Sequence, residues 1–286
     1  MIGVVNINKP VGTTSSNVVV KIKKLLNIKK VGHMGTLDPL AQGVLPICVG
    51  KATRLFDYFL KKKKTYIAQF KFGEQTDTLD LEGNIIKKSN NIPTLQQVND
   101  ALKHFIGEIE QIPPMFSSKK INGKKAYDLA RKGEEVELKP CKITIYEYKT
   151  LKQIDDDTFE FLITCSAGTY IRCLGRDLGE KLNSCATMVS LIRTKTGPFL
   201  IDNALDYNSL TKEDLIKNLI PLQEVLIDFE EFTISQQDFQ KLLNGIPLNT
   251  INLKEDVFYT TICEGNVVGI GEVKNGLFTL KTFLAE

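Results

Sequence analysis

The sequence predicts an α+β protein with one large domain and a small β-rich one. The 286 residues exceed the size of a usual single hydrophobic core. Predicted strands and helices follow one another without the regular spacing of βαβ units. From about residue 228 onward short strands dominate, and Asn275-Gly276 between two apolar runs is typical of a tight hairpin. We therefore expect a large domain over 1–225 and a small one over 226–286.

The N-terminal part begins with a predicted strand over 3–8 (GVVNIN). A helix follows with apolar residues at helical spacing, and Ser15 or Ser16 is the expected N-terminal cap. The Gly- and Pro-rich segment 31–50 contains too many helix breakers for one long helix, and it predicts a structured loop that leads into a strand. Thr65–Phe72 alternates as a half-buried strand does.

The elements of the remaining chain follow from local signals. Thr94 with Gln97 predicts a capping box at the start of a helix. Beyond it, the patterns predict a helix over 124–132, strands near 142–152 and 158–165, a helix capped by Thr169, and a helix over about 236–243.

Several classes of protein are disfavoured by what the sequence lacks. The six cysteines form no CxxC pair, the two histidines have no metal-site spacing, and no dinucleotide or phosphate-loop motif occurs. We therefore expect no metal and no cofactor. No apolar stretch approaches the ~20 residues that span a bilayer, and no signal peptide is recognisable, so we expect a cytoplasmic protein without membrane contact. Nothing indicates a protein partner, so we expect a monomer.

Charge is distributed unevenly along the chain. Residues 1–72 hold thirteen Lys or Arg and two acids, a net charge of +11, whereas the rest holds 24 basic and 32 acidic residues, a net charge of −8. A basic region of this kind indicates a local contact with a polyanion, although a solvated lysine-rich face explains the charge alone equally well. The candidate phosphate contacts are Lys21, Lys23, Lys24, Lys29, Lys30 and Lys61 to Lys64.

Asp38 lies in the most informative segment of the sequence, GHMGTLDPLAQGVLP over 32–46. The following proline restricts the backbone, and the surrounding glycines allow the main chain to approach a ligand closely. A carboxylate on such a loop can be a nucleophile, a general base, a metal ligand or a structural turn residue. No second acid occurs within eighteen residues on either side, which favours single-carboxylate chemistry on a polyanion.

This segment resembles the catalytic motif of the TruB-type tRNA pseudouridine synthases. Four further blocks resemble the family in order and spacing, from about residue 3 to 200: NINKPVGTTSS, KKTYIAQFKFGEQTDTLDLEG, IPPMFSSKKINGKKAYDLARKGEEVE and CSAGTYIRCLGRDLGEKL. The sequence departs from the common pattern at Met34, where threonine is frequent, and at Ile192, where arginine is frequent.

The resemblance implies a pseudouridine synthase fold, with a large mixed, mainly antiparallel sheet flanked by helices and a small PUA-like C-terminal domain. It implies that the protein isomerises a uridine, at position 55 in the T loop of tRNA, to pseudouridine without a cofactor. The partner is then the T-stem-loop of tRNA, with an RNA-contacting arm near 112–138. Because uracil in a stacked loop is inaccessible, the nucleotide must be flipped out. A contribution to tRNA folding can coexist with this activity.

Individual roles also follow from the resemblance. Asp38 is the expected catalytic carboxylate, Tyr66 the tyrosine that stacks on the target base, and Arg172 the cation that pairs with Asp38. Among the other expected contacts to substrate, Tyr170 and Leu191 line the uracil pocket, His33 contacts the flipped RNA, Asp80 is a polar residue near the substrate, and Lys9 supports the catalytic loop.

Three other functions compete with this interpretation. A tRNA-binding or folding factor needs no catalytic carboxylate at all. A glycosidase or base-excising enzyme also breaks a glycosidic bond, but such enzymes usually use two carboxylates, and one is evident here. A synthase of the same fold that acts on another RNA, such as a guide-RNA-dependent relative, is the nearest competitor. The short N-terminus and the absence of long basic tails favour the stand-alone bacterial type.

Overall fold

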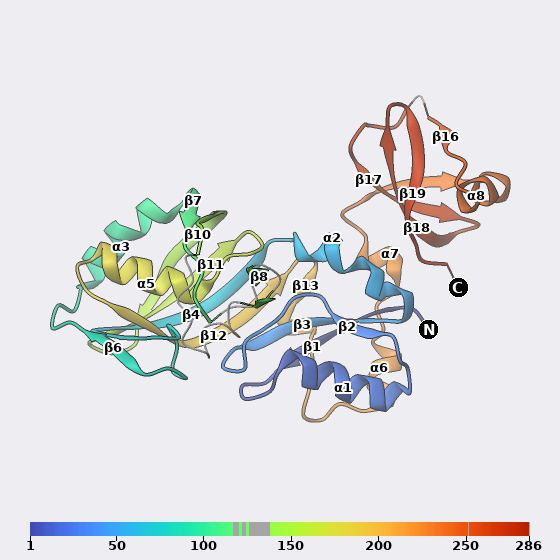
Figure 1. Cartoon of the computed structure of the whole chain (residues 1–286). Coiled ribbons are helices and arrows are strands. Elements are labelled where there is room, and N and C mark those ends of the chain that lie inside the picture. Colours follow the sequence, from blue (N-terminus) through green and yellow to red (C-terminus); the bar gives the residue numbers. More distant parts are fainter. Residues whose placement is uncertain (117–119, 122–123, 126–137, 251, 286) are drawn as a thin grey trace.

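The computed structural model describes residues 1–116, 120–121, 124–125, 138–250 and 252–285. Within these residues the chain forms a ten-stranded sheet with helices against it and a separate five-stranded sheet (Figure 1). The main path of the large sheet runs β14-β1-β3-β12-β4-β11-β10-β7, with β2 paired to β3 and β13 paired to β12. The small sheet has the order β15-β17-β18-β19-β16.

The bounds of the elements of the first half are β1 (Gly3–Lys9), α1 (Ser15–Leu26), β2 (Val31–His33), β3 (Gln42–Val49), η1 (Gly50–Leu55), α2 (Phe56–Leu60), β4 (Lys64–Phe72), β5 (Glu74–Thr76), β6 (Ile85–Lys88), α3 (Leu95–Leu102), η2 (Lys103–Phe105), β7 (Gly107–Gln111), β8 (Lys120–Ile121) and β9 (Lys124–Lys125). Those of the second half are β10 (Cys141–Gln153), β11 (Thr158–Cys165), α5 (Ile171–Lys181), β12 (Ala186–Thr196), β13 (Phe199–Leu200), η3 (Ile201–Asn203), β14 (Leu205–Asp206), α6 (Lys212–Lys217), α7 (Leu222–Val225), β15 (Glu230–Ile234), α8 (Gln236–Leu243), β16 (Leu248–Asn249), β17 (Phe258–Cys263), β18 (Asn266–Lys274) and β19 (Leu277–Phe283).

The large sheet is mixed and mainly antiparallel, as predicted. Its two parallel pairs are β1 with β14 and β12 with β3, whereas the remaining pairs among the described strands are antiparallel. Strand β12, from late in the sequence, lies between β3 and β4, both from the first quarter. This insertion places a segment from far along the chain between two early segments in the sheet.

Both faces of the sheet are buried where β3 runs. Leu45 and Ile47 lie in a cluster that also contains apolar side chains of α1, α3 and α5. Val44 and Cys48, which alternate with them, lie in a second cluster with side chains of η1, α2 and α7. Strands buried on both faces are expected to be almost continuously apolar, and β3 (QGVLPICV) has this composition.

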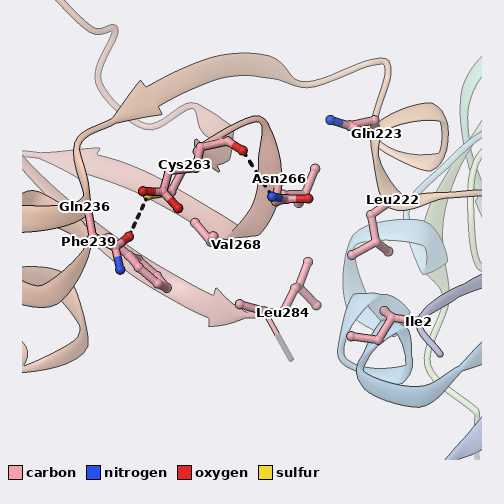
Figure 2. A pocket seen from close by; sticks show the side chains of 12 residues that line it. Ile2, Leu222, Gln223, Gln236, Phe239, Cys263, Asn266, Val268 and Leu284 are labelled. Carbon is pink, nitrogen blue, oxygen red and sulfur yellow. Dashed lines mark hydrogen bonds between the residues drawn. The ribbon is translucent and has the colours of Figure 1, made fainter.

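The small sheet has its own apolar cluster but is also joined to the large domain. Ile270 of β18 and Leu284 lie in the second cluster of the large domain. The ring of Tyr58, from α2, contacts Phe229 and Phe258 edge-on at centroid distances of 6.1 and 5.1 Å. Packing across this junction is incomplete, because a pocket of about 560 Å³ opens beside it (Figure 2). Its walls include Ile2 and Leu222 on one side and residues of the small domain on the other.

Most local predictions agree with the structure. The capping box of Thr94 and Gln97 is present, α8 spans the predicted helix, and Lys274 pairs with Leu277 across the Asn275-Gly276 turn. The predicted strands at 142–152 and 158–165 correspond to β10 and β11.

Three predictions were wrong in detail. Helix α1 is capped by Thr14 rather than by Ser15 or Ser16, and α5 has Tyr170 rather than Thr169 at its N-cap position. Lys124–Lys125 forms a strand instead of beginning a helix. The rest of that predicted helix, and much of the predicted arm over 112–138, lies outside the described residues.

Candidate active site

Asp38 lies on the loop that joins β2 to β3. The loop turns sharply after it, because the Ala41 backbone N–H donates to the Asp38 carbonyl at 3.0 Å. Gly35, at φ +119°, supplies a backbone conformation that other residues rarely adopt. The Asp38 side chain is 42% exposed, and its Oδ2 lies 3.3 Å from Nη2 of Arg172. The carboxylate is therefore accessible and paired with a cation at the same time.

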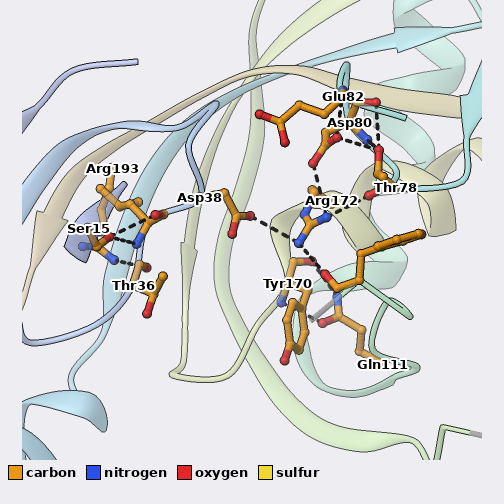
Figure 3. Close-up of polar contacts among 12 residues, drawn as sticks. Ser15, Thr36, Asp38, Thr78, Asp80, Glu82, Gln111, Tyr170, Arg172 and Arg193 are labelled. Carbon is orange, nitrogen blue, oxygen red and sulfur yellow. Dashed lines mark hydrogen bonds and ion pairs between the residues drawn. The ribbon is translucent and has the colours of Figure 1, made fainter. Parts of the chain in front are cut away.

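Arg172 links Asp38 to a second carboxylate (Figure 3). Its Nη1 lies 3.2 Å from Oδ2 of Asp80 and donates to the Thr78 carbonyl at 2.8 Å. Its Nη2 also donates to the Phe116 carbonyl at 3.1 Å. The Arg172 side chain is 9% exposed, so its orientation is fixed by buried partners rather than by solvent. A charge held in this way is a pre-formed partner for a reacting carboxylate.

Asp80 is itself held by a tight local network. Its Oδ1 accepts hydrogen bonds from the Thr78 hydroxyl at 2.6 Å and from the Glu82 backbone N–H at 3.0 Å. Its backbone forms an isolated bridge to Met188 of β12. Asp80 is buried, so its carboxylate contacts Arg172 and is not accessible to solvent as that of Asp38 is. Sequence reasoning placed it only near the substrate, whereas the structure places it behind the guanidinium.

Tyr66 lies on β4 and is buried, and its electrostatic environment includes Asp38 and Arg193. Burial raises the pKa of its hydroxyl to about 12, which outweighs the lowering effect of the neighbouring Arg193 guanidinium. The phenol therefore stays protonated at physiological pH. It can donate or relay a hydrogen bond, but it is a poor candidate for a free phenolate base.

Tyr170 and Leu191 have different surroundings. The Tyr170 backbone is held by a reciprocal pair with buried Gln111, whose Oε1 accepts from the Tyr170 N–H at 2.9 Å and whose Nε2 donates to the Tyr170 carbonyl at 3.1 Å. The side chain of Tyr170 is half-buried. Leu191 is buried on β12 in the same apolar cluster as Tyr66. The role of each toward uracil stays a prediction.

His33 and Lys9 both lie next to the loop. His33 is the last residue of β2 and is half-buried. Burial lowers the pKa of its imidazole, and the positive charge of Arg193 lowers it further. Its Nδ1 has no hydrogen-bond partner among the described residues. The Lys9 ammonium is fully buried and donates to the carbonyls of Pro10, Thr13 and Pro39 at 2.9, 2.6 and 3.4 Å. Burial lowers the pKa of Lys9 to about 8, although Asp38 acts in the opposite direction. Lys9 thus contacts the residue directly after Asp38.

Three residues that sequence reasoning did not select also contact the site. The Ser15 hydroxyl accepts from the Leu37 N–H at 2.9 Å and donates to the Leu37 carbonyl at 3.0 Å. Arg193 donates to carbonyls of the catalytic loop, and Gln111 holds Tyr170. Gln111 and Arg193 could have been found by one signal in the sequence. Each is a polar residue at a position where the alternation of its strand predicts an inward-facing apolar side chain.

Some of the predicted phosphate contacts have internal partners. The Lys21 ammonium donates to the Tyr207 carbonyl at 2.6 Å, and Lys62 pairs with Asp228 at 2.8 Å. Lys64 is buried, and its ammonium donates to the carbonyls of Leu60 and Lys62. The departure at Met34 has no direct bearing on the site, because that side chain is buried in the second apolar cluster.

The arrangement suits chemistry by a single exposed carboxylate. The other carboxylate is buried behind the shared guanidinium, so the two acids are not a pair that flanks one reacting bond. In the described residues no group of three or more His, Cys, Asp or Glu side chains could hold a metal ion. The same residues include no helix long and apolar enough to cross a membrane.

Comparison with known proteins decides the family. The model of the TruB family pseudouridylate synthase, N-terminal domain, matches residues 23–171, which include Asp38, Tyr66 and Asp80. The chain belongs to the TruB family. This family assignment explains why the five sequence blocks occur along the chain in the order typical of the family.

The TruB-family relatives extend over nearly the whole chain. A tRNA pseudouridine synthase B of Clostridium kluyveri is 41% identical over 285 residues and covers 98% of both chains. One of Clostridium tetani is 42% identical and covers 98% of this chain and 99% of its own. Among solved structures, a Cbf5-Nop10-Gar1 complex matches at 25% identity with a TM-score of 0.76, over 98% of this chain and 84% of that one. The likeness therefore includes the small C-terminal sheet.

Proposed function

We propose that this chain isomerises uridine 55 in the T loop of tRNA to pseudouridine, with Asp38 as the catalytic carboxylate. The reaction breaks the bond between the uracil nitrogen and the ribose, rotates the base and joins its carbon 5 to the sugar. All atoms of the nucleotide are retained and no redox change occurs, so the reaction has no need of a cofactor.

The observation that carries the proposal is the accessible Asp38 carboxylate held 3.3 Å from a buried guanidinium. The relatives named tRNA pseudouridine synthase B support tRNA as the substrate. In this arrangement Arg172 orients Asp38 toward the extruded nucleotide, and the protonated Tyr66 supplies an aromatic face and a hydroxyl. Tyr170, Leu191 and His33 are proposed to surround the base and its strand.

The test is to map pseudouridine in unmodified tRNA after incubation with the purified protein and with Asp38→Asn. We expect modification at the T-loop uridine by the wild type and a loss of at least 10³-fold in the variant, with tRNA binding retained. Asp57→Asn is the matched control, because Asp57 is the other acid of the basic region and lies exposed on α2. Full activity of Asp38→Asn would refute the proposal.

The same assay separates the alternatives. Free uracil released from the RNA indicates a base-excising enzyme, and modification at another position indicates another RNA substrate. Binding that speeds tRNA folding without modification indicates a folding factor. The domain division at 225, the RNA-contacting arm, the cytoplasmic location and the monomeric state stay predictions.

A further inference from the structure

We propose that Arg193 is a positioning residue for the isomerisation, which holds the loop that carries Asp38 and the hydroxyl of Tyr66 in one fixed relative geometry. The inference rests on the proposed function. In Figure 3 Arg193 lies on the side of Asp38 opposite to Arg172, next to Ser15 and Thr36. The two arginines therefore approach the catalytic loop from different sides, and only Arg172 pairs with the carboxylate.

The contacts of Arg193 are directed at the backbone of the loop and of the strand that follows it. Its Nε donates to the Val44 carbonyl at 2.7 Å. Its Nη1 donates to the Thr36 carbonyl at 3.3 Å and its Nη2 to the Gly35 carbonyl at 3.2 Å. These carbonyls precede Asp38 by two and three residues. One planar guanidinium thus fixes the distance between the start of β3 and the segment before the carboxylate.

The same guanidinium is also a neighbour of the tyrosine. Arg193 and Tyr66 are cross-strand neighbours in the pairing of β12 with β4, and the guanidinium is near enough to the Tyr66 hydroxyl to act on its pKa. The described hydrogen bonds of the Arg193 side chain all involve neutral groups, namely the three carbonyls. A fully buried cation without a carboxylate at contact distance has a high desolvation cost. A buried cation of this kind is expected where it fixes a specific geometry rather than where it adds stability.

The fold supplies this position through Gly43. Arg193 is also the register partner of Gly43 in the parallel pairing of β12 with β3. A Cβ atom at residue 43 would lie 2.3 Å from the Arg193 carbonyl oxygen, and the residue has φ +109°. Only glycine therefore allows β12 to come close enough for the Arg193 side chain to reach back to Gly35.

A positioning role has a specific kinetic consequence. Displacement of a reacting group by about 1 Å can lower a rate by about 10²-fold. Arg193 is 1% exposed, so it cannot contact the RNA itself. Its loss should therefore slow the chemical step and leave RNA affinity almost unchanged.

The experiment compares Arg193→Lys and Arg193→Met with the wild type under single-turnover conditions, on an unmodified T-arm RNA hairpin and with saturating protein. We expect the rate constant to fall by about 10²-fold in both variants, and the hairpin Kd to change by less than about threefold. Saturating single-turnover rate constants do not depend on a misfolded fraction, so partial loss of folding leaves the readout intact. Lys195→Met is the matched control, because Lys195 is an exposed cation on the same strand.

A second readout tests the link to the tyrosine. In a Tyr66→Phe background, Arg193→Lys should lower the rate by a smaller factor than it does in the wild type, because the hydroxyl beside the guanidinium is already gone. Equal factors would mean that Arg193 acts without the hydroxyl and would overturn that part of the proposal.

Two outcomes overturn the proposal as a whole. One is a rate within threefold of the wild type in both Arg193 variants; the other is failure of both variants to fold, which would assign Arg193 to folding alone. A failure of the proposed function is separate, because the wild type and Lys195→Met would then also form no pseudouridine.

Discussion

At the scale of single residues, the site separates two carboxylates by burial. Asp38 and Asp80 share one guanidinium, but the side chain of Asp38 is 42% exposed and that of Asp80 only 6%. A buried carboxylate behind the cation keeps Arg172 from rotating toward solvent when substrate enters. Asp38 is thus the one of this pair that can reach a bound nucleotide.

Tyr66 gives a prediction about alkaline pH. Its pKa is raised from about 10 to about 12, so between these values the unfolded chain loses the proton and the folded chain retains it. The free energy of unfolding should therefore fall as pH rises through this window, by up to about 2–3 kcal/mol from this residue. Urea unfolding between pH 9.5 and 11.5 should show a shallower decline in Tyr66→Phe than in the wild type.

Tyr146→Phe is the control for this measurement, because Tyr146 is 44% exposed on β10. Its variant should retain the decline of the wild type. Identical pH dependence in Tyr66→Phe and the wild type would contradict the assigned burial of the Tyr66 hydroxyl.

The residues that the sequence could identify are those with a local motif. Asp38 lies in a Gly- and Pro-rich segment and Arg172 in the block GTYIR, so both were recognisable. Arg193 and Ser15 were missed because their partners are backbone groups of a loop remote in sequence. A hydrogen bond to a carbonyl requires no particular residue type at the acceptor, and it therefore leaves no pattern in the sequence.

At the scale of elements, two neighbouring hydroxyls at the N-terminus of α1 have different roles. The Thr14 side chain accepts from the Asn17 N–H and caps the helix. The Ser15 hydroxyl satisfies both backbone groups of Leu37, one residue before Asp38. The sequence offered Ser15 as a cap because serine is a common one, and tertiary contact decided otherwise.

This division predicts different effects for Thr14→Ala and Ser15→Ala. Thr14→Ala should lower the free energy of unfolding by about 1 kcal/mol and leave the rate of pseudouridine formation unchanged. Ser15→Ala leaves buried backbone groups unpaired, so it should cost about 1–3 kcal/mol and also slow the reaction several-fold. Denaturant unfolding and single-turnover assays on both variants check this, and equal rates in the two would contradict the assignment.

The order of the strands shows where sequence reasoning ends. Individual strands such as β4 and β10 follow from alternation, because the pattern of a strand is local. That β12 lies between β3 and β4 depends on pairings across more than a hundred residues, and no local pattern encodes them.

At the scale of the whole molecule, side chains of the large domain contact the small domain directly. The ring of Tyr58 makes two edge-on contacts there, and its hydroxyl forms a hydrogen bond with the Thr282 hydroxyl at 2.9 Å. Arg54 donates to the Phe283 carbonyl at 2.8 Å. Because an apolar cluster also continues across the junction, we expect the wild type to unfold in a single thermal transition.

Tyr58→Ala should weaken this junction. Removal of the ring leaves a gap between Phe229 and Phe258, and it should cost about 2 kcal/mol. Scanning calorimetry should then resolve two transitions, with the small domain unfolding first. Tyr146→Ala, which removes an exposed ring of β10 that makes no ring contact with Phe229 or Phe258 in the described residues, should keep one transition. A single unshifted transition in Tyr58→Ala would show that the domains do not depend on this contact.

The long reach of Arg193 also has a consequence for the order of biosynthesis. The residues whose carbonyls accept its hydrogen bonds precede it by 149 to 158 positions, so a ribosome completes the catalytic loop long before it makes the side chain that holds that loop. A nascent chain that ends before β12 already contains Asp38 and Tyr66, but β3 and β4 have no strand between them. The centre is therefore assembled late in translation, when most of the large domain is available.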